Sequence, residues 1–187
     1  LIPPDDAFED QRWPGMGWKE KLAPFYEKAK FMLGAVPADY EGETDKILKE
    51  CADYMGRRSS YQKVDVGVYF GKTGEMVKDP YFNGTGPDRT GCTRCGGCMV
   101  GCRYNAKNTL DKNYLYLAEQ LGVSIMSEQE VEDIFPLEDG GYQLTLKKST
   151  GIRRSVRKMQ AKKVVLSGGV LGTVKLLLKC RQNGNLS

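Results

Sequence analysis

The chain has 187 residues, 40% of them hydrophobic, and its 28 basic and 24 acidic side chains leave a formal charge of +4. The length fits one domain or two small ones, and the apolar content excludes an intrinsically disordered chain. The charge is too mild to predict a nucleic-acid partner, and no apolar run approaches the roughly 20 residues that span a membrane. Since no signal peptide is recognisable, we expect a cytoplasmic protein.

The first 107 residues are predicted to begin with helices and to end in a loop. In chain order we expect an extended segment, two helices, a strand and a glycine-rich loop, at 1–16, 18–34, 44–55, 61–70 and 71–107. Pro24 predicts a break in the first helix, because proline lacks the N–H that a helix interior uses. Thr44 is the expected cap of the second helix and Gly56 its end. Cys51 is expected to be a buried structural thiol on the apolar face of that helix.

Residues 108–187 are predicted to form a helix, a β-meander and a final strand–glycine–helix unit. The expected boundaries are 108–121 for the helix, 123–126, 130–136, 142–148 and 152–159 for the meander strands, and 163–180 for the last unit. Asn108 is the expected helix cap, and turns are expected at 139–141 and 149–151. The sequence therefore predicts an α+β fold of helices and antiparallel meander strands, divided functionally into residues 1–107 and 108–187.

Four cysteines lie within eleven residues of the long loop, in the spacing C-x2-C-x2-C-x3-C that is typical of ferredoxins. They are Cys92, Cys95, Cys98 and Cys102. Three interpretations stay open: a 4Fe-4S cluster, a tetrahedral zinc ion, or no metal at all, with disulfides or free thiols. Two features depart from a simple ferredoxin. Arg103 replaces the proline that usually follows the fourth cysteine, and no second cysteine run exists, so one cluster would need Cys102 to bend back or a remote ligand such as Cys51 or Cys180.

A second candidate site is the segment VVLSGGVLG, which runs from a predicted strand through Gly168 and Gly169 into a helix. Such a turn presents backbone N–H groups and a positive helix end to an anion such as a pyrophosphate. The alternative is an ordinary turn whose glycines permit close packing. The chain contains no G-x-G-x-x-G, so it carries no complete dinucleotide fingerprint. It also contains no histidine, which excludes a Ser-His-Asp triad or a histidine general base within it.

Taken together, these segments resemble the FAD-dependent glucose–methanol–choline (GMC) oxidoreductases, and in particular their cholesterol-oxidase-like bacterial branch. The resemblance rests on the residues 18–34, 79–122, 130–134 and 163–178. It implies that residues 1–107 belong to the substrate region, that residues 108–187 belong to the FAD-binding domain, and that the main chain of Val131 meets the FAD adenine. It also implies that four residues of the last turn lie close to FAD, namely Ser167, Gly168, Gly169 and Gly172.

The resemblance further implies an internal fragment of a longer enzyme. The family's N-terminal glycine fingerprint and its C-terminal catalytic histidine are absent from this chain. The missing N- and C-terminal parts are then its partners, no catalytic residue lies within it, and it is expected to be inactive alone. The parent would oxidise an alcohol, sterol-like or other, by hydride transfer to FAD. A cluster in the cysteine loop would pass electrons to an external acceptor, which would make the parent a dehydrogenase instead of an oxidase.

A second hypothesis comes from a different class of protein. On this hypothesis the chain is a small iron–sulfur or zinc-binding module that transfers electrons or has a structural role, without catalysis of its own.

Overall fold

The structure is a computed structural model and describes residues 3–152 and 154–186. It forms two compact units, the first up to Val123 and the second from Ser124 onward. The strands of every sheet pair antiparallel, so the predicted α+β class is confirmed. The functional division at residues 107 and 108 stays a prediction. Among the described residues, no helix combines the length and the apolar character that crossing a bilayer requires.

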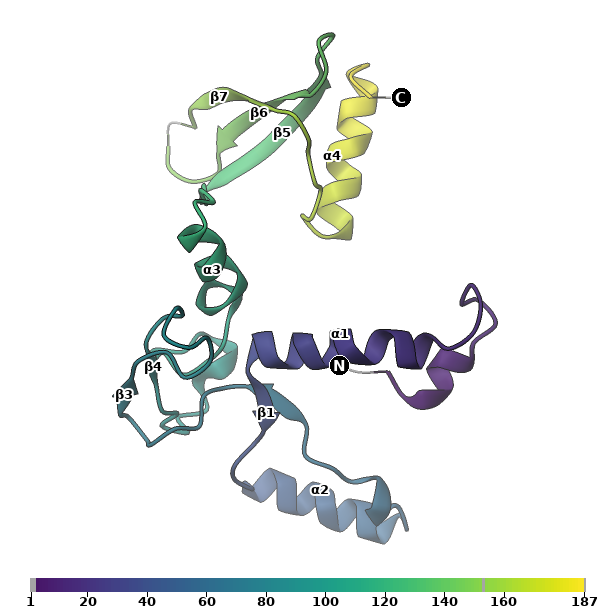
Figure 1. Cartoon of the computed structure of the whole chain (residues 1–187), viewed down its shortest axis with the longest axis vertical. Coiled ribbons are helices and arrows are strands. Elements are labelled where there is room, and N and C mark those ends of the chain that lie inside the picture. Colours follow the sequence, from purple (N-terminus) through teal and green to yellow (C-terminus); the bar gives the residue numbers. More distant parts are fainter. Residues whose placement is uncertain (1–2, 153, 187) are drawn as a thin grey trace. The chain divides into compact units, whose positions relative to one another are not determined.

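Unit 1 is made of short elements joined by long loops (Figure 1). Its α-helices are α1 (Trp18–Leu33), α2 (Glu43–Tyr54) and α3 (Tyr114–Gln120), and its 3-10 turns are η1 (Asp5–Glu9), η2 (Arg58–Ser60), η3 (Gly97–Met99) and η4 (Leu110–Lys112). Two small sheets complete it, β1 (Ala35–Pro37) with β2 (Asp65–Gly67), and β3 (Met76–Val77) with β4 (Arg89–Thr90). Of the strand predicted at 61–70, only β2 forms among the described residues. The 3-10 turn η1 lies in the segment 1–16, which was expected to be extended. Leu1 and Ile2, which begin that segment, lie outside the described residues.

Several predictions about the helices of unit 1 are wrong. α1 continues through Pro24, because the backbone hydrogen bonds of the turns before and after it hold the helix where proline has no N–H to donate. α2 begins one residue earlier than expected, since the carboxylate of Asp45 accepts the N–H of Gly42 at 2.8 Å and so caps the helix in place of Thr44. Cys51 is exposed, because no described residue covers its face of α2.

The helix expected to start at Asn108 starts six residues later. Asn113 caps α3 by accepting the N–H of Tyr114. The side chain of Asn108 is used elsewhere: it accepts a bond from Arg89 and donates to the hydroxyl of Tyr81 at 3.0 Å. An asparagine that bonds to another segment is not available to cap its own helix.

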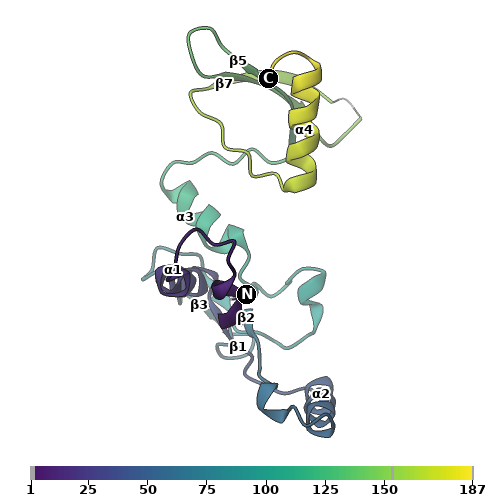
Figure 2. The same ribbon diagram turned by 90° about the vertical axis from the view of Figure 1, so that its right-hand side faces the viewer.

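Unit 2 is a three-stranded sheet with one helix beside it (Figures 1 and 2). The sheet order is β5 (Gln129–Pro136), β6 (Tyr142–Lys148) and β7 (Val156–Ala161), and α4 (Val170–Gln182) packs against β5. The turns predicted at 139–141 and 149–151 are confirmed, with Gly140, Gly141 and Gly151 at positive φ. Arg153, within the strand predicted at 152–159, lies outside the described residues.

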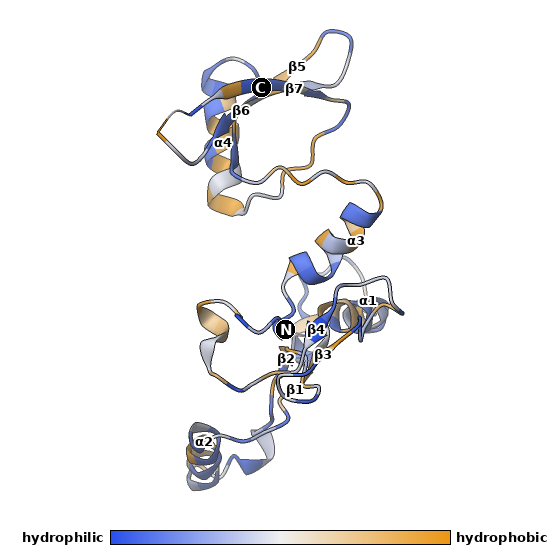
Figure 3. Ribbon diagram, turned by 90° about the vertical axis from the view of Figure 1, so that its left-hand side faces the viewer, coloured by the Kyte–Doolittle hydropathy of each residue, from blue (hydrophilic) through white to orange (hydrophobic). Residues whose placement is uncertain are grey.

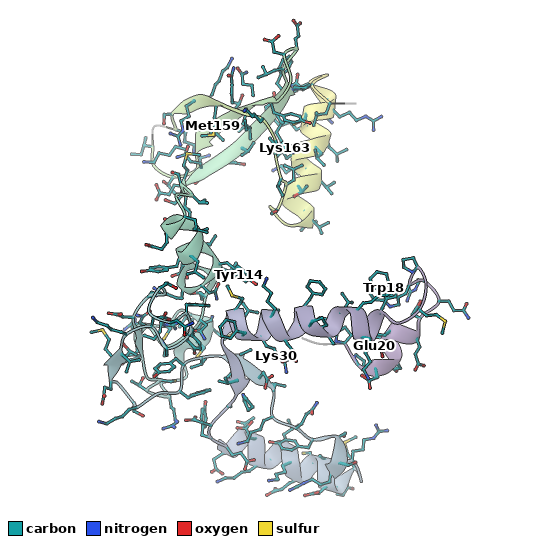
Figure 4. All side chains as sticks on the ribbon, in the orientation of Figure 1. Trp18, Glu20, Lys30, Tyr114, Met159 and Lys163 are labelled. Atoms are coloured by element: carbon teal, nitrogen blue, oxygen red, sulfur yellow. The ribbon has the colours of Figure 1, made fainter. Side chains whose placement is uncertain are left out.

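Two predicted strands of unit 2 do not form. Residues 123–126 and 163–166 have no regular secondary structure, and neither segment pairs with a described neighbour. Lys163 lies on this segment between β7 and α4 (Figure 4). The segment has the β-branched composition of a strand, yet Val165 is 87% exposed and Leu166 40% exposed. A strand requires a partner for its N–H and C=O groups, and the described chain supplies none here.

The chain buries little apolar surface. Its accessible surface is 14586 Å², whereas two separate folded units of these sizes would together expose about 11,000 Å². The buried apolar residues are Val68 and Ala106 in unit 1 and Ile134, Leu146 and Cys180 in unit 2. Hydrophobic stretches stay open on α4 and on the segment before it (Figure 3). We infer that these surfaces are made to pack against further protein.

Asp79 organises the turn that leads toward the cysteine loop. Its carboxylate accepts the N–H groups of Tyr81 at 3.0 Å, Phe82 at 2.9 Å, Gly84 at 2.8 Å and Gly86 at 2.9 Å. Partial burial raises the pKa of Asp79, but these four bonds to the charged form outweigh burial and bring the pKa below its usual value.

We expect Asp79→Ala to loosen this turn, because four N–H groups lose their shared acceptor. The amides of residues 81–86 should exchange hydrogen at least about tenfold faster relative to their intrinsic rates, which corresponds to about 1.4 kcal/mol of lost protection. Asp88→Ala is the control, since the exposed Asp88 uses only its backbone oxygen, toward Asn105. Equal exchange in the two variants would contradict the role of Asp79.

The same turn should loosen in acid. Because the folded pKa of Asp79 is depressed, its stabilising effect is complete above the unfolded pKa of about 4. The effect is lost as the pH falls through the lower folded pKa. The protection of residues 81–86 in the unmodified chain, measured as exchange relative to the intrinsic rate at each pH, should therefore decrease in that acid range.

Asp133 fastens the end of α4 to β5. Its carboxylate accepts the amide of Asn185 at 2.7 Å and that of Asn183 at 3.4 Å. Cys180, fully buried between the helix and the sheet, lies beside it. Burial, and then the neighbouring carboxylate, raise the pKa of the Cys180 thiol, so it should react slowly.

We expect Asp133→Ala to release the helix end and expose Cys180. Alkylation of Cys180, followed by peptide mass spectrometry, should accelerate by about tenfold or more, because reaction requires local opening. Asp139→Ala, in the exposed β5–β6 turn, should leave the rate unchanged. If Cys180 stays equally protected in Asp133→Ala, the carboxylate does not hold the helix.

Candidate functional site

The residues implied to meet the flavin come together in unit 2. Val131 on β5 and three residues before or within α4, Ser167, Gly168 and Gly172, line one cavity of about 650 Å³. Gly169 does not line this cavity but is the N-terminal cap residue of α4, with φ 76°. Residues separated by more than 30 positions in sequence are thus brought to one place by the packing of α4 on β5.

A β-bulge shapes the wall of this cavity. The register of β5 against β6 shifts between Val131 and Asp133, so Glu132 has no residue opposite it. A bulge interrupts the alternation of a strand and re-aims its side chains. As a result Val131 and Ile134, three residues apart, lie on the same face of the sheet, since their partners Leu146 and Leu144 are two residues apart on β6. On this face Val131 lines the cavity and Ile134 is buried in the core.

The N-terminus of α4 is open to an anion. No side chain caps it, and its first intrahelical bond runs from the N–H of Thr173 to the carbonyl of Gly169 at 3.0 Å. The preceding N–H groups of a helix have no intrahelical acceptor, and they carry the positive end of the helix dipole. The turn therefore has the donors that a phosphate group requires.

The glycines of this turn are not needed for close packing within the chain. A Cβ atom at Gly172 or Gly169 would meet no atom within 4 Å, and one at Gly168 would meet only the hydroxyl of Thr173, at 3.7 Å. The structure thus argues against the interpretation that the glycines permit close packing of helix on strand. They leave open space above the backbone, which fits a flat ligand such as a flavin nucleotide.

Charged side chains of both signs surround the cavity. Glu130 and Glu132 come from β5, and Lys175 and Lys179 from successive turns of α4. Glu132 forms an ion pair with Lys147 at 3.0 Å, and this bond lowers its pKa below the usual value. The lysines leave positive charge on the helix side of the cavity.

The cysteine loop of unit 1 is the second candidate site. All four cysteines of the run line one small cavity of about 40 Å³. The two ends of the loop are bound to the same residue: the N–H of Cys92 donates to the carbonyl of Tyr69 at 3.0 Å, and the N–H of Tyr69 donates to the carbonyl of Ala106 at 2.8 Å. The loop is therefore closed at its base.

Backbone N–H groups point at two of the sulfur atoms. Arg94 donates to the Sγ of Cys92 at 3.3 Å, and Ala106 donates to the Sγ of Cys102 at 3.4 Å. Partial burial raises the pKa of Cys102, but N–H groups of residues 104, 106 and 107, together with the charge of Arg89, outweigh it and lower the pKa below its usual value. These contacts favour the thiolate form of Cys102 more than in an ordinary cysteine.

Arg89 is the residue that sequence reasoning missed. It is only 1% exposed, and its guanidinium donates to the carbonyls of Asn105 at 3.0 Å and Lys107 at 2.8 Å and to the side chain of Asn108. No carboxylate pairs with it among the described residues. A lone arginine in a glycine-rich loop gives no periodic signal, so its burial could not be predicted.

Within residues 3–152 and 154–186, no three His, Cys, Asp or Glu side chains stand close enough together to hold a metal ion. Cys95 and Cys98 are exposed, and Cys92 and Cys102 are half-buried. The predicted remote ligands Cys51 and Cys180 do not line the cysteine cavity. The metal-binding role of the run stays a prediction.

Known proteins similar to this chain were found over its whole length. Residues 82–180 match the family described as GMC oxidoreductase. Two curated relatives from Mycobacterium tuberculosis, strains CDC 1551 / Oshkosh and ATCC 25618 / H37Rv, are each named cholesterol oxidase. Both are 43% identical over 192 residues, which cover 99% of this chain and 33% of the relative. A cholesterol oxidase of Acinetobacter baumannii is 38% identical over 197 residues, which cover 100% of this chain and 35% of the relative.

The chain therefore spans about a third of the length of the curated relatives it matches. The matching family covers more than half of the chain and includes both the cysteine loop and the turn before α4. This chain belongs to the GMC oxidoreductase family, whose members are FAD-dependent.

Proposed function

We propose that the chain is the middle part of an FAD-dependent oxidoreductase that oxidises an alcohol. One observation carries the proposal: Val131, Ser167, Gly168 and Gly172 line a single cavity whose glycines leave space above the backbone. Family membership supports the cofactor. The missing N- and C-terminal parts would complete the flavin site, as the uncovered apolar surface of α4 suggests.

In the proposed reaction the alcohol is oxidised to a carbonyl compound. FAD, when bound, supplies the acceptor for the hydride that leaves the carbinol carbon, and a base takes the hydroxyl proton. The residues of this chain would bind FAD and orient it. The backbone at Val131 would face the adenine, and the N-terminus of α4 would face the phosphates with its N–H groups. Since the chain has no histidine, a histidine base would come from outside it.

A sterol-like alcohol is the proposed substrate class, because the relatives named above are cholesterol oxidases. The test is anaerobic flavin reduction in the protein expressed from its complete reading frame. Cholesterol should bleach the visible absorbance of the bound flavin, whereas a short alcohol such as ethanol should leave it unchanged. Bleaching by neither, in protein that holds FAD, would reject the alcohol oxidation proposed here.

The cysteine loop supports a second candidate role. Its four thiols line one cavity, and they would hold an iron–sulfur cluster or, alternatively, a zinc ion. A cluster would take electrons singly from reduced flavin and pass them to an external acceptor. If FAD binding fails while metal binding holds, the chain is instead an electron-transfer or structural module without catalysis.

We expect Gly172→Val to weaken FAD binding while leaving the fold unchanged. The valine side chain would occupy open space beside the cavity, and valine is no worse a helix former than glycine. FAD affinity, measured by quenching of flavin fluorescence in the complete protein, should fall at least about tenfold, or about 1.4 kcal/mol.

Gln182→Val is the control for this variant, since Gln182 is an exposed polar residue at the other end of the same helix and does not line the cavity. Its FAD affinity and its circular dichroism should equal those of the unmodified protein. Unchanged affinity in Gly172→Val would show that the flavin does not lie over this turn.

A further inference from the structure

We propose that Lys175 binds the diphosphate of FAD in the cavity of unit 2 and so selects for nucleotides that carry this diphosphate. The inference rests on the proposed function, because it takes the cavity lined by Val131 and Gly172 to be the flavin site. It goes beyond that function by assigning recognition of the phosphates to a side chain of α4, in addition to the N–H groups of the first helical turn.

The first argument is the position of Lys175 on α4. Gly172 precedes it by three residues, and Lys179 follows it by four. Residues at these spacings share one face of an α-helix. All three line the same cavity, and a Cβ atom at Gly172 would meet no atom within 4 Å. Lys175 therefore borders the open space over this glycine.

The second argument is the direction of the side chain. Every Cα–Cβ bond of an α-helix is tilted toward the N-terminus of the helix, so a long side chain covers the turn before its own Cα. We therefore expect the ammonium group of Lys175 to extend back toward Gly172 and the first turn of α4, which no described side chain caps. A phosphate group beside this turn would be within reach of the lysine.

The third argument is the charge balance of the cavity. The ion pair with Lys147 lowers the pKa of Glu132, and the charge of Lys179 lowers it further. Glu130, the other carboxylate of the cavity, lies opposite Lys147 in the register of β5 and β6. Among the described residues no carboxylate forms an ion pair with Lys175, and like charges one helical turn apart repel each other. An anion in the cavity would offset this repulsion.

The size and lining of the cavity favour a nucleotide over a small inorganic anion. Its volume of about 650 Å³ lies in the range of sites for small-molecule ligands and cofactors. Apolar side chains of Val131, Leu166 and Leu176 line it together with the lysines. A ligand that fits both kinds of wall has a flat, weakly polar part and an anionic part. FAD has both, and its diphosphate is the anionic part.

The test compares Lys175→Gln with the unmodified protein, each expressed from the complete reading frame and freed of FAD. Glutamine is about as good a helix former as lysine, and Lys175 is exposed, so the variant should fold. Its affinity for FAD, measured by quenching of flavin fluorescence, should fall at least about threefold at low ionic strength, the effect of one partly solvated ion pair. The loss should become smaller at high ionic strength, because salt screens the interaction.

ADP and adenosine identify the part of the ligand that Lys175 contacts. ADP carries the diphosphate, whereas adenosine lacks it. In calorimetric titrations, Lys175→Gln should bind ADP more weakly than the unmodified protein does and should bind adenosine equally well. An equal loss of affinity for adenosine, or unchanged affinity for FAD and ADP, would overturn the proposal.

Two further variants are controls. Lys158→Gln removes the same charge from β7, where Lys158 is exposed and does not line the cavity, so its affinity for FAD should be unchanged. Lys175→Arg keeps a positive charge that binds phosphate, so it should retain affinity for FAD and ADP. An equal loss in Lys158→Gln would mean that net charge alone attracts the nucleotide. Binding in Lys175→Arg as weak as in Lys175→Gln would mean that Lys175 does not act through its charge.

This inference and the proposed function fail separately. If cholesterol bleaches the bound flavin but Lys175→Gln binds FAD as tightly as the unmodified protein, alcohol oxidation stands and the role of Lys175 is rejected. If Lys175→Gln weakens FAD binding while no alcohol bleaches the flavin, the role of Lys175 stands and alcohol oxidation is rejected.

Discussion

The buried guanidinium of Arg89 connects the parts of unit 1. It lies on β4, just before the cysteine loop, and its donors hold the residues 105–108 at the end of that loop. Asn108 extends the connection to Tyr81 and to the carbonyl of Gly34 at the end of α1. Among the described residues of unit 1, Val68 and Ala106 alone form a buried apolar centre, so this network replaces much of the packing that usually orders a domain.

A network of this kind fixes a loop more sharply than apolar packing would, because each bond has a direction. The cysteine loop is accordingly closed at its base while its tip is exposed. Such an arrangement fits a site in which the exposed tip of the loop becomes ordered when a ligand binds. The same reasoning applies to unit 2, where Asp133 and Cys180 fix one end of α4 and no described side chain caps the end beside the cavity lined by Val131 and Gly172.

The two candidate sites share one property: each presents hydrogen-bond donors and positive side chains to a cavity, although Glu130 and Glu132 also line the cavity of unit 2. In unit 2 these are the N–H groups of the α4 N-terminus and two lysines, and in unit 1 they are Arg94, Lys107 and the N–H groups at two sulfurs. A phosphate-bearing flavin and a thiolate-bound cluster are both anions. The proposed flavin and electron-transfer roles thus rest on the same electrostatic argument, applied to different ligands.

The sequence by itself determined most helices, strands and turns of this protein, because these depend on residues that are close together in the chain. Periodicity located α1, α2, α4 and most of the meander strands, and glycines located the turns. The segments that resemble the family pointed to four residues that the structure brings to one cavity. Tertiary structure alone decided what depends on a distant partner. Asn108 bonds to Arg89 instead of capping a helix, Cys51 lacks a cover, and residues 163–166 lack a neighbouring strand. The reason is physical: propensity acts within a few residues, whereas burial and strand pairing require another segment of chain.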